Sequence, residues 1–545
     1  MTTPAAANAA QTGQMTQRDI IKALIGMLLG MMTAFLSSTI VSTALPTIVT
    51  SLHGSQDQYT WVVTATLLAS TSSTPIWGKL ADLVNKKVLV QIAIATFTLG
   101  SIAAGFSQSV GTLILWRGFQ GLGLGGLQAL IVIVIAAMVS PRERGKYMGP
   151  IAAVMSVATV AGPLLGGFIV DSPLGWRWCF FAGAPLAIVA LIVVQRTLNI
   201  PTVKREVHID YIGAALLTSG VSTLLIWITL AGNSFEWQSP ISFGMAGTGV
   251  ALIAALLFVE TKVREPIIPL RMFTDRTTTL ATIASIGVGT AMFGGAVFLG
   301  QYFQIARGFS PTAAGLLMLP MIAGSMLSST GTGLLITKFG RWKIFLVLGS
   351  IVMTAGFGLL STIDSDTNMV AVGAYLLLLG TGMGALTQNL VLAVQNSSRA
   401  DDIGASSSIV SFFRSLGGTI GVSVLGAILS DRVATHIANG LKQLGISPGQ
   451  VAEGGSETVG LSTLNELPPP VADIVRDAYG NGTGAIFLVS LGMAVLAVIC
   501  VVFIKEVRLN TKNSIEQQQD AQKQNLAADQ SRSCKTELET AAAGS

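Results

Sequence analysis

Long apolar runs that carry almost no charge follow one another along most of this chain. A helix needs about 20 apolar residues to cross a bilayer, and these runs approach or exceed that length. Only 11% of the residues are charged, whereas soluble domains carry about 25%, so a soluble globular protein is excluded. The sequence predicts an all-α membrane protein with fourteen spans at residues 24–43, 61–77, 88–106, 110–139, 148–170, 179–194, 212–230, 241–259, 280–303, 313–336, 344–360, 369–392, 403–429 and 485–503.

The basic residues predict how these spans are oriented. Lys and Arg concentrate in the short loops on the cytoplasmic side of a membrane. If the chain starts in the cytoplasm, two of the 32 Lys and Arg fall within spans and only five fall in external segments: Arg177, Arg307, Arg432, Lys442 and Arg476. Both termini are therefore predicted to be cytoplasmic.

The spans divide the chain into five segments. We expect a cytoplasmic tail at 1–22, a six-helix bundle at 23–198, two inserted helices with a linker at 199–276, a second six-helix bundle at 277–503, and a disordered cytoplasmic tail at 504–545. Within the second bundle, Gly-rich and Pro-rich residues 430–481 predict an external loop with a short amphipathic helix. Basic loops beginning at Gly78 and Gly333 each follow the second span of a bundle, which predicts an internal repeat.

Arg117 lies inside the fourth apolar run, where a charge costs about 2.5 to 3.5 kcal/mol on insertion scales. Gln120, Gly121 and Gln128 share its helical face by their spacing, so this face is predicted to line a protein interior or an aqueous path. A functional role is favoured because ionisable residues within spans are usually functional. A structural anchor is the alternative, and close helix packing alone also explains Gly121 and Gly125.

Motifs along the whole chain resemble those of the major facilitator superfamily. Residues 78–87 resemble its signature loop, 113–126 resemble its fourth-span motif with a buried arginine, and 162–167 resemble the antiporter motif of its exporters. Stretches at 39–46, 176–178, 302–320 and 414–418 are similar to the fourteen-span drug:proton antiporter family. The resemblance implies a major facilitator-type bundle of fourteen helices in the cell membrane that works as a multidrug efflux antiporter.

The resemblance also implies which residues act in coupling and gating: Arg117, Asp82, Gly78, Gln120, Gly162, Pro163, Gly166 and Arg414. Asp82 is expected to pair with cations or helix ends while the cytoplasmic side is closed, with a plain topology-setting loop as the alternative. Pro163 between its glycines allows either bending or simple close packing. Structural anchoring is an equal alternative for Arg414, and Glu260 is expected to be a solvated helix end.

Three positions depart from the family pattern. Ser37 follows Leu36 where relatives commonly carry an aspartate, Gly183 stands where an asparagine is frequent, and Asn85 stands where a glycine is frequent. Ser37 removes a protonatable group from the middle of the membrane. Because an unpaired buried cation is costly, we expect neutral or weakly anionic amphipaths, such as bile acids or fatty acids, to be preferred over permanent cations.

The substrate is expected near the midplane between the two bundles, where flexible apolar side chains offer an adaptable surface. Ordinary core packing is the alternative for each candidate lining residue: Ser37, Met31, Phe35, Gln128, Met155, Met292, Phe293 and Phe298.

The leading functional prediction is a proton-coupled exporter of lipophilic or amphipathic small molecules, acting as a monomer whose partners are substrate, protons and the lipid bilayer. A non-transporting membrane sensor or scaffold, and a nutrient importer or uniporter of the same fold, are the alternatives. Neither an enzyme nor a nucleic-acid binder is expected. The isolated cysteines and histidines predict no metal site and no cofactor.

Overall fold

The computed structural model describes residues 17–53, 56–200, 210–232, 235–263, 265–399, 402–444, 468–509 and 516. Apart from an isolated bridge between Ala231 and Phe235, the regular structure of these residues is helical. The helices are α2 (Gln17–Ser51), α3 (Gln56–Leu83), α4 (Lys86–Gly105), α5 (Val110–Met138), α6 (Pro141–Asp171), α7 (Trp178–Phe181), α8 (Ala184–Thr197), α9 (Tyr211–Leu230), α10 (Pro240–Glu260), η1 (Leu270–Thr274), α11 (Arg276–Gln301), η2 (Tyr302–Ala306), α12 (Pro311–Leu317), α13 (Leu319–Phe339), α14 (Lys343–Leu360), α15 (Met369–Ser397), α16 (Ile403–Gln443) and α19 (Pro469–Phe503).

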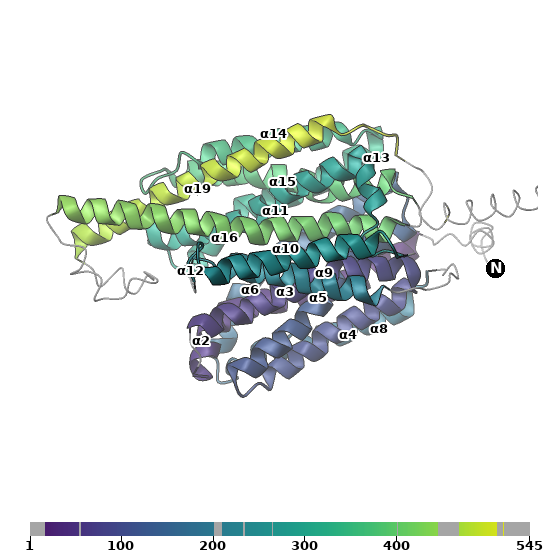
Figure 1. Ribbon diagram of the computed structural model, residues 1–545, viewed down its shortest axis with the longest axis horizontal. Coiled ribbons are helices and arrows are strands. Elements are labelled where there is room, and N and C mark those ends of the chain that lie inside the picture. The colour runs from purple at the N-terminus through teal and green to yellow at the C-terminus, as the bar shows by residue number, and fades with distance from the viewer. Residues whose placement is uncertain are drawn as a thin grey trace, which may run out of the picture.

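The helices pack into two groups joined by a pair (Figure 1). In the first group, α5 packs on α3 and α4, while α2 packs on α6 and α8. In the second, α11 packs on α16, α15 packs on α13 and α14, and α19 packs on α11, α14 and α16. The groups meet where α3 contacts α16 and α6 contacts α13. The pair α9 and α10 lies across this meeting, with α9 in contact with both α3 and α16.

Twelve of the described helical segments are long and apolar enough to cross a membrane. The predicted fourteen spans also include α3 and α6, which that set lacks. The sequence of α3 explains its low hydropathy, since it contains five consecutive buried Ser and Thr residues at 70–74. Those polar side chains face neighbouring helices, so a hydropathy criterion underestimates how well α3 is enclosed.

The prediction of an external loop over 430–481 was wrong at both of its ends. Helix α16 continues to Gln443, and α19 begins at Pro469. The extension of α16 buries Val433 and Leu441, which lie about two helical turns apart, and the extension of α19 buries Val475. This burial of apolar side chains stabilises both extensions as helices. Residues 445–467 lie outside the described residues.

The first residues of the tail predicted to be disordered at 504–545 are ordered. Residues 504–509 pack against the second group, where the indole N–H of Trp342 donates to the Val507 carbonyl at 2.8 Å. The Asn396 amide donates to the carbonyls of Val507 at 3.4 Å and Arg508 at 3.2 Å. Apart from Glu516, the rest of this tail and residues 1–16 lie outside the described residues.

Candidate functional site

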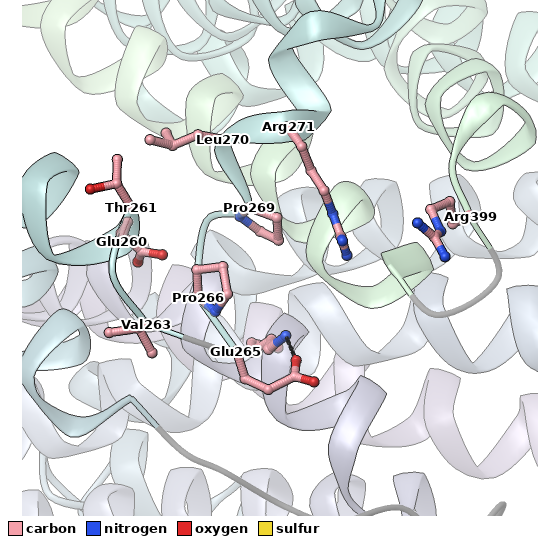
Figure 2. Close-up of a pocket in the computed structure, with 10 residues that line it drawn as sticks. Glu260, Thr261, Val263, Glu265, Pro266, Pro269, Leu270, Arg271 and Arg399 are labelled. Atoms are coloured by element: carbon pink, nitrogen blue, oxygen red, sulfur yellow. Dashed lines mark hydrogen bonds and ion pairs between the residues drawn. The ribbon is translucent and has the colours of Figure 1, made fainter.

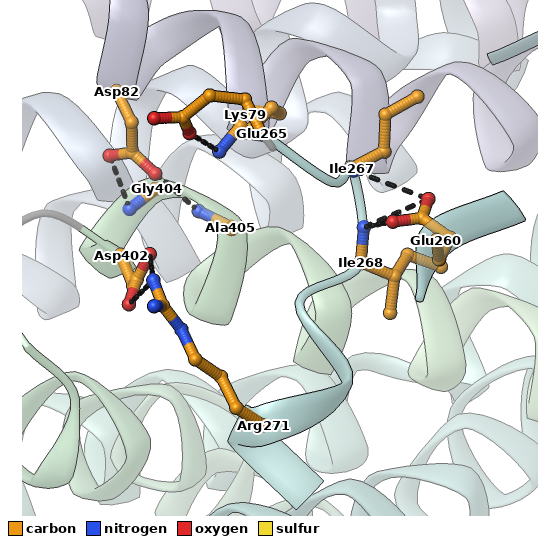
Figure 3. Close-up of polar contacts among 10 residues, drawn as sticks. All are labelled: Lys79, Asp82, Glu260, Glu265, Ile267, Ile268, Arg271, Asp402, Gly404 and Ala405. Atoms are coloured by element: carbon orange, nitrogen blue, oxygen red, sulfur yellow. Dashed lines mark hydrogen bonds and ion pairs between the residues drawn. The ribbon is translucent and has the colours of Figure 1, made fainter. Parts of the chain in front are cut away.

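The first contact between the two helix groups is a carboxylate against a helix end. Asp82, near the end of α3, accepts hydrogen bonds from the backbone N–H groups of Gly404 at 2.8 Å and Ala405 at 2.9 Å in the first turn of α16 (Figure 3). First-turn N–H groups have no partner within their own helix, so an anion there satisfies them. Gly78, one turn earlier, allows this approach, because a Cβ in its place would overlap Ser408.

A second contact repeats this geometry between α13 and α6. Gly333 lies so close to Gly145 that a Cβ on either would overlap the other's backbone. Thr337 follows Gly333 by four residues, just as Asp82 follows Gly78. The carbonyl of Thr337 accepts a hydrogen bond from Nε of Arg142 at 3.4 Å. We call the end of the molecule where these two contacts lie the closed end.

A buried arginine, one of the many basic residues predicted to lie on the cytoplasmic side, also bridges the groups at the closed end. Arg144 of α6 is 1% exposed and donates through Nη1 to the Gln395 side chain of α15 at 2.6 Å. Its other nitrogens donate to the carbonyls of Val139 and Ala136. The Gln395 amide in turn donates to Ser407 of α16 at 2.7 Å. A basic residue in a short loop carries no sequence signal that distinguishes this role.

Arg117 of α5 is 3% exposed, and its Nη1 donates to Oε1 of Gln120 at 2.7 Å. Nε of Arg117 and Nε2 of Gln120 are buried without a hydrogen-bond partner. Within the described part of the chain, no carboxylate forms an ion pair with Arg117. The predicted polar face is split by its neighbours, because Gln120 lies against Gly100 of α4 while Gly121 lies against Thr66 of α3.

The glycines of α6 pack against α2. Thr39 donates its hydroxyl to the Ala158 carbonyl at 2.9 Å, and a Cβ at Gly162 would overlap Thr39. A Cβ at Gly166 would lie 2.8 Å from the Ile40 carbonyl oxygen. Helix α6 continues through Pro163, whose side chain lies outside the described residues. This geometry is close helix packing, and a gating role for the stretch stays a prediction.

Two of the positions that depart from the family pattern lie side by side. A Cβ at Gly183 would lie 3.7 Å from Cβ of Ser37. Ser37 is 1% exposed, and its hydroxyl oxygen is buried without a hydrogen-bond partner. The aspartate and the asparagine that are frequent at these positions in relatives would therefore be neighbours.

The other predicted cavity residues differ in their exposure. Met31 and Phe298 are buried in apolar clusters, as core residues are. Phe293 lies against Gly418 of α16. On the same helix, Arg414, which was predicted to act in coupling, donates to the Thr387 carbonyl of α15 at 3.1 Å. The remaining candidates are half-buried, and their role in lining the substrate cavity stays a prediction: Phe35, Gln128, Met155 and Met292.

A cavity of about 400 Å³ lies at the closed end between the linker that follows α10, the end of α3 and the α15–α16 connection (Figure 2). Its lining includes Lys79, Glu265, Arg271 and Arg399. Glu260 also lines it, but this residue is only 4% exposed and accepts from the backbone N–H groups of the linker. The expectation that Glu260 is a solvated helix end was wrong, because the chain folds back over its carboxylate.

Comparison with known proteins identifies a family. The family model described as Major Facilitator Superfamily matches residues 27–422. The multidrug transporter protein MdtP of Bacillus subtilis (strain 168) is 30% identical over 495 residues, which cover 87% of this chain and 91% of that protein. The efflux pump dotC of Dothistroma septosporum (strain NZE10) is 31% identical over 479 residues, 86% of this chain and 82% of that protein.

An uncharacterized transporter of major facilitator type from Mycobacterium tuberculosis is 33% identical over 85% of this chain, which spans 66% of that relative's length. Among solved structures, the proton:xylose symporter XylE aligns with a TM-score of 0.61 and 14% identity over 92% of this chain and 99% of that one. The human organic anion transporter MFSD10 aligns with a TM-score of 0.56, also at 14% identity, over 87% and 99%. At these identities the two structures support the fold alone.

Proposed function

Because the chain belongs to the major facilitator superfamily, we propose that it exports lipophilic or amphipathic small molecules across the cell membrane in exchange for protons. Two relatives, named a multidrug transporter protein and an efflux pump, support export, since each aligns over more than four fifths of both chains. A proton that falls through 100 mV releases about 2.3 kcal/mol, which is a driving force for uphill export.

The proposal includes fourteen spans, with α3 and α6 added to the twelve apolar helices. Their 28 and 31 residues correspond to about 42 and 46 Å of helix, which is enough to cross a bilayer. An even number of spans puts both termini on one side, and the distribution of Lys and Arg favours the cytoplasm. The closed end, where Asp82 and Arg144 lie among the basic loops, is then the cytoplasmic end.

The observation that carries the transport mechanism is the contact between Asp82 and the start of α16. It joins the two helix groups through two hydrogen bonds to an anion, at a site where Gly78 permits close approach. Such a contact holds the cytoplasmic end shut and can be lost as a unit when the groups separate. This is the behaviour that alternating access requires of a cytoplasmic gate.

Arg117 supports a preference for neutral or anionic substrates. Its guanidinium is buried and keeps an unpaired Nε, while no described carboxylate neutralises it. A fixed positive charge in the first helix group disfavours a permanent cation nearby and favours an anionic group. Arg117 is therefore proposed to act in coupling, either by setting the proton affinity of its surroundings or by holding an anion.

Purified protein in liposomes tests the function directly. With a proton gradient imposed, movement of a fluorescent lipophilic anion against its concentration gradient is expected, and a protonophore should abolish it. Arg117→Ala serves as the matched control variant. Uphill movement that survives the protonophore would exclude proton coupling, facilitated movement only down the gradient would indicate a uniporter, and absence of movement would favour a sensor or scaffold.

A further inference from the structure

The linker between α10 and α11, described at residues 261–263 and 265–275, forms an ion pair with each helix group at the closed end (Figure 3). Towards the first group, the Glu265 carboxylate accepts from Nζ of Lys79 in α3 at 2.6 Å. Towards the second group, Nη2 of Arg271 donates to both carboxylate oxygens of Asp402, at 3.0 and 2.8 Å, immediately before α16 begins. The linker thus connects the same two helices that Asp82 connects.

Between its two ion pairs, the linker is fixed to the body of the protein. The Glu260 carboxylate accepts from the backbone N–H groups of Ile267 at 3.2 Å and Ile268 at 3.3 Å. Both isoleucine side chains are buried in an apolar cluster that includes Leu68 of α3 and Ile409 of α16. The segment cannot lengthen without exposing these side chains and leaving the Glu260 carboxylate without its two donors.

Two prolines add to this stiffness. Pro266 and Pro269 flank the isoleucine pair, and each fixes its own φ and restricts the residue before it. Only five residues separate Glu265 from Arg271, so the connection between the two ion pairs is short. A short, anchored connection transmits displacement of α3 to α16 instead of absorbing it.

We propose that the linker is a tie that holds the cytoplasmic end closed, with Glu265 and Arg271 as its two attachment points. The proposal rests on the alternating access proposed above, because opening separates α3 from α16. The tie cannot follow both helices, so one of its ion pairs breaks at every opening. The inserted helices α9 and α10 thereby help to set how often the cytoplasmic end opens.

The cavity beside the tie is lined by residues of both attachments, which differ in their exposure to solvent (Figure 2). Arg271 is 61% exposed at its side chain and Lys79 is 9% exposed, so solvent screens the Arg271 pair more than the Lys79 pair. The Arg271–Asp402 pair is therefore the weaker attachment and the one that breaks first. The Lys79–Glu265 pair stays with the first helix group.

The tie can be tested without any substrate. Ser408 is fully buried against Gly78 between α3 and α16, so a cysteine there reacts with N-ethylmaleimide only when the cytoplasmic end opens. Ser408→Cys is made in a background in which Cys179, Cys500 and Cys534 are replaced by serine or alanine. The alkylation rate is measured in nanodiscs for Glu265→Gln, for Arg271→Gln and for the double variant.

Two attachments in series give a distinctive result, because after either ion pair is cut the linker no longer joins the two helix groups through ion pairs at both ends. Each single variant should raise the alkylation rate by about three- to tenfold, and the double variant should equal the larger single effect. The matched controls are Glu143→Gln and Arg476→Gln, whose ion pairs with Lys146 and Asp473 lie within one helix. Both controls should leave the rate unchanged.

Rates in Glu265→Gln and Arg271→Gln that equal the parent rate would overturn the tie. A double variant whose effect is the product of the two single effects would also overturn it, because independent contacts multiply and a series connection does not. Monodisperse elution of each variant checks that it is folded. The alkylation assay uses no substrate, so a failure of the export proposal would leave its result interpretable and would show in the liposome assay instead.

Discussion

Asp82→Asn removes a charge from the closed end with almost no change in shape. Both carboxylate oxygens of Asp82 accept from α16, one from Gly404 and one from Ala405. An amide offers one oxygen, and its NH₂ group must face one of these N–H donors, so one hydrogen bond is lost. A hydrogen bond to a charged group contributes about 1.5 to 3 kcal/mol, and an anion at a helix N-terminus adds about 0.3 to 1 kcal/mol.

We therefore expect the closed state to lose about 2 to 4 kcal/mol relative to the state that is open to the cytoplasm, or about 30- to 900-fold in equilibrium constant. The outward half of the export cycle requires this end to close behind the bound substrate, so turnover should fall. Substrate affinity should change little, because Asp82 lies at the rim of the molecule. Initial efflux rates over a range of substrate concentrations separate these quantities, and alkylation of Ser408→Cys reports opening independently.

The matched control is Asp473→Asn, whose carboxylate pairs with Arg476 within α19 and makes no contact between the helix groups. It should leave both turnover and alkylation unchanged. If Asp82→Asn weakened substrate affinity tenfold while turnover stayed constant, Asp82 would belong to the substrate site. If alkylation stayed at the parent rate, the contact with α16 would not hold this end closed.

Arg117→Ala should insert and fold but lose active efflux by tenfold or more, equivalent to about 1.4 kcal/mol. Arg117→Lys should also be impaired because an ammonium lacks the planar guanidinium fork; normal efflux per folded molecule in either would contradict the role. Ser37→Asp should lower the thermal stability of the protein and shift export from a lipophilic anion toward a matched cation. Adding Gly183→Asn to Ser37→Asp should restore the thermal stability. An unchanged ratio of cation export to anion export would place substrate recognition elsewhere. Gly333→Val should raise the alkylation rate of Ser408→Cys, because the valine side chain would overlap Gly145. Gly331→Val should leave this rate unchanged, because Gly331 has open space around it. Equal alkylation rates in the two variants would refute the close approach of α13 to α6.

The sequence predicted the helices well where lipid determines composition. The span predicted at 212–230 is α9, Tyr211–Leu230, because an apolar run records exposure to hydrocarbon. Outside the bilayer this signal disappears. The extensions of α16 and α19 contain Gly440 and Pro469, so their composition resembled a loop, although they bury apolar side chains against each other.

The candidate site was predictable as a set of residue types but not as a set of contacts. The motif indicated that Asp82 pairs with a cation or a helix end. Its partners are the backbone N–H groups of Gly404 and Ala405, more than 300 positions later in the sequence, and backbone groups carry no sequence signal. For the same reason the Glu260 carboxylate, which binds linker backbone, looked like a solvated helix end.

The two glycine contacts at the closed end share a geometry but differ in chemistry. The α3–α16 contact adds the charge of Asp82, whereas the α6–α13 contact has Thr337 at the matching position and relies on the fit of Gly145 against Gly333. The Asp82 carboxylate makes two hydrogen bonds to α16, whereas the one charged hydrogen bond across α6 and α13, from Arg142 to the Thr337 carbonyl, is long at 3.4 Å. More of the α3–α16 contact therefore depends on charge, and we expect rising ionic strength to loosen that side of the closed end more than the α6–α13 side.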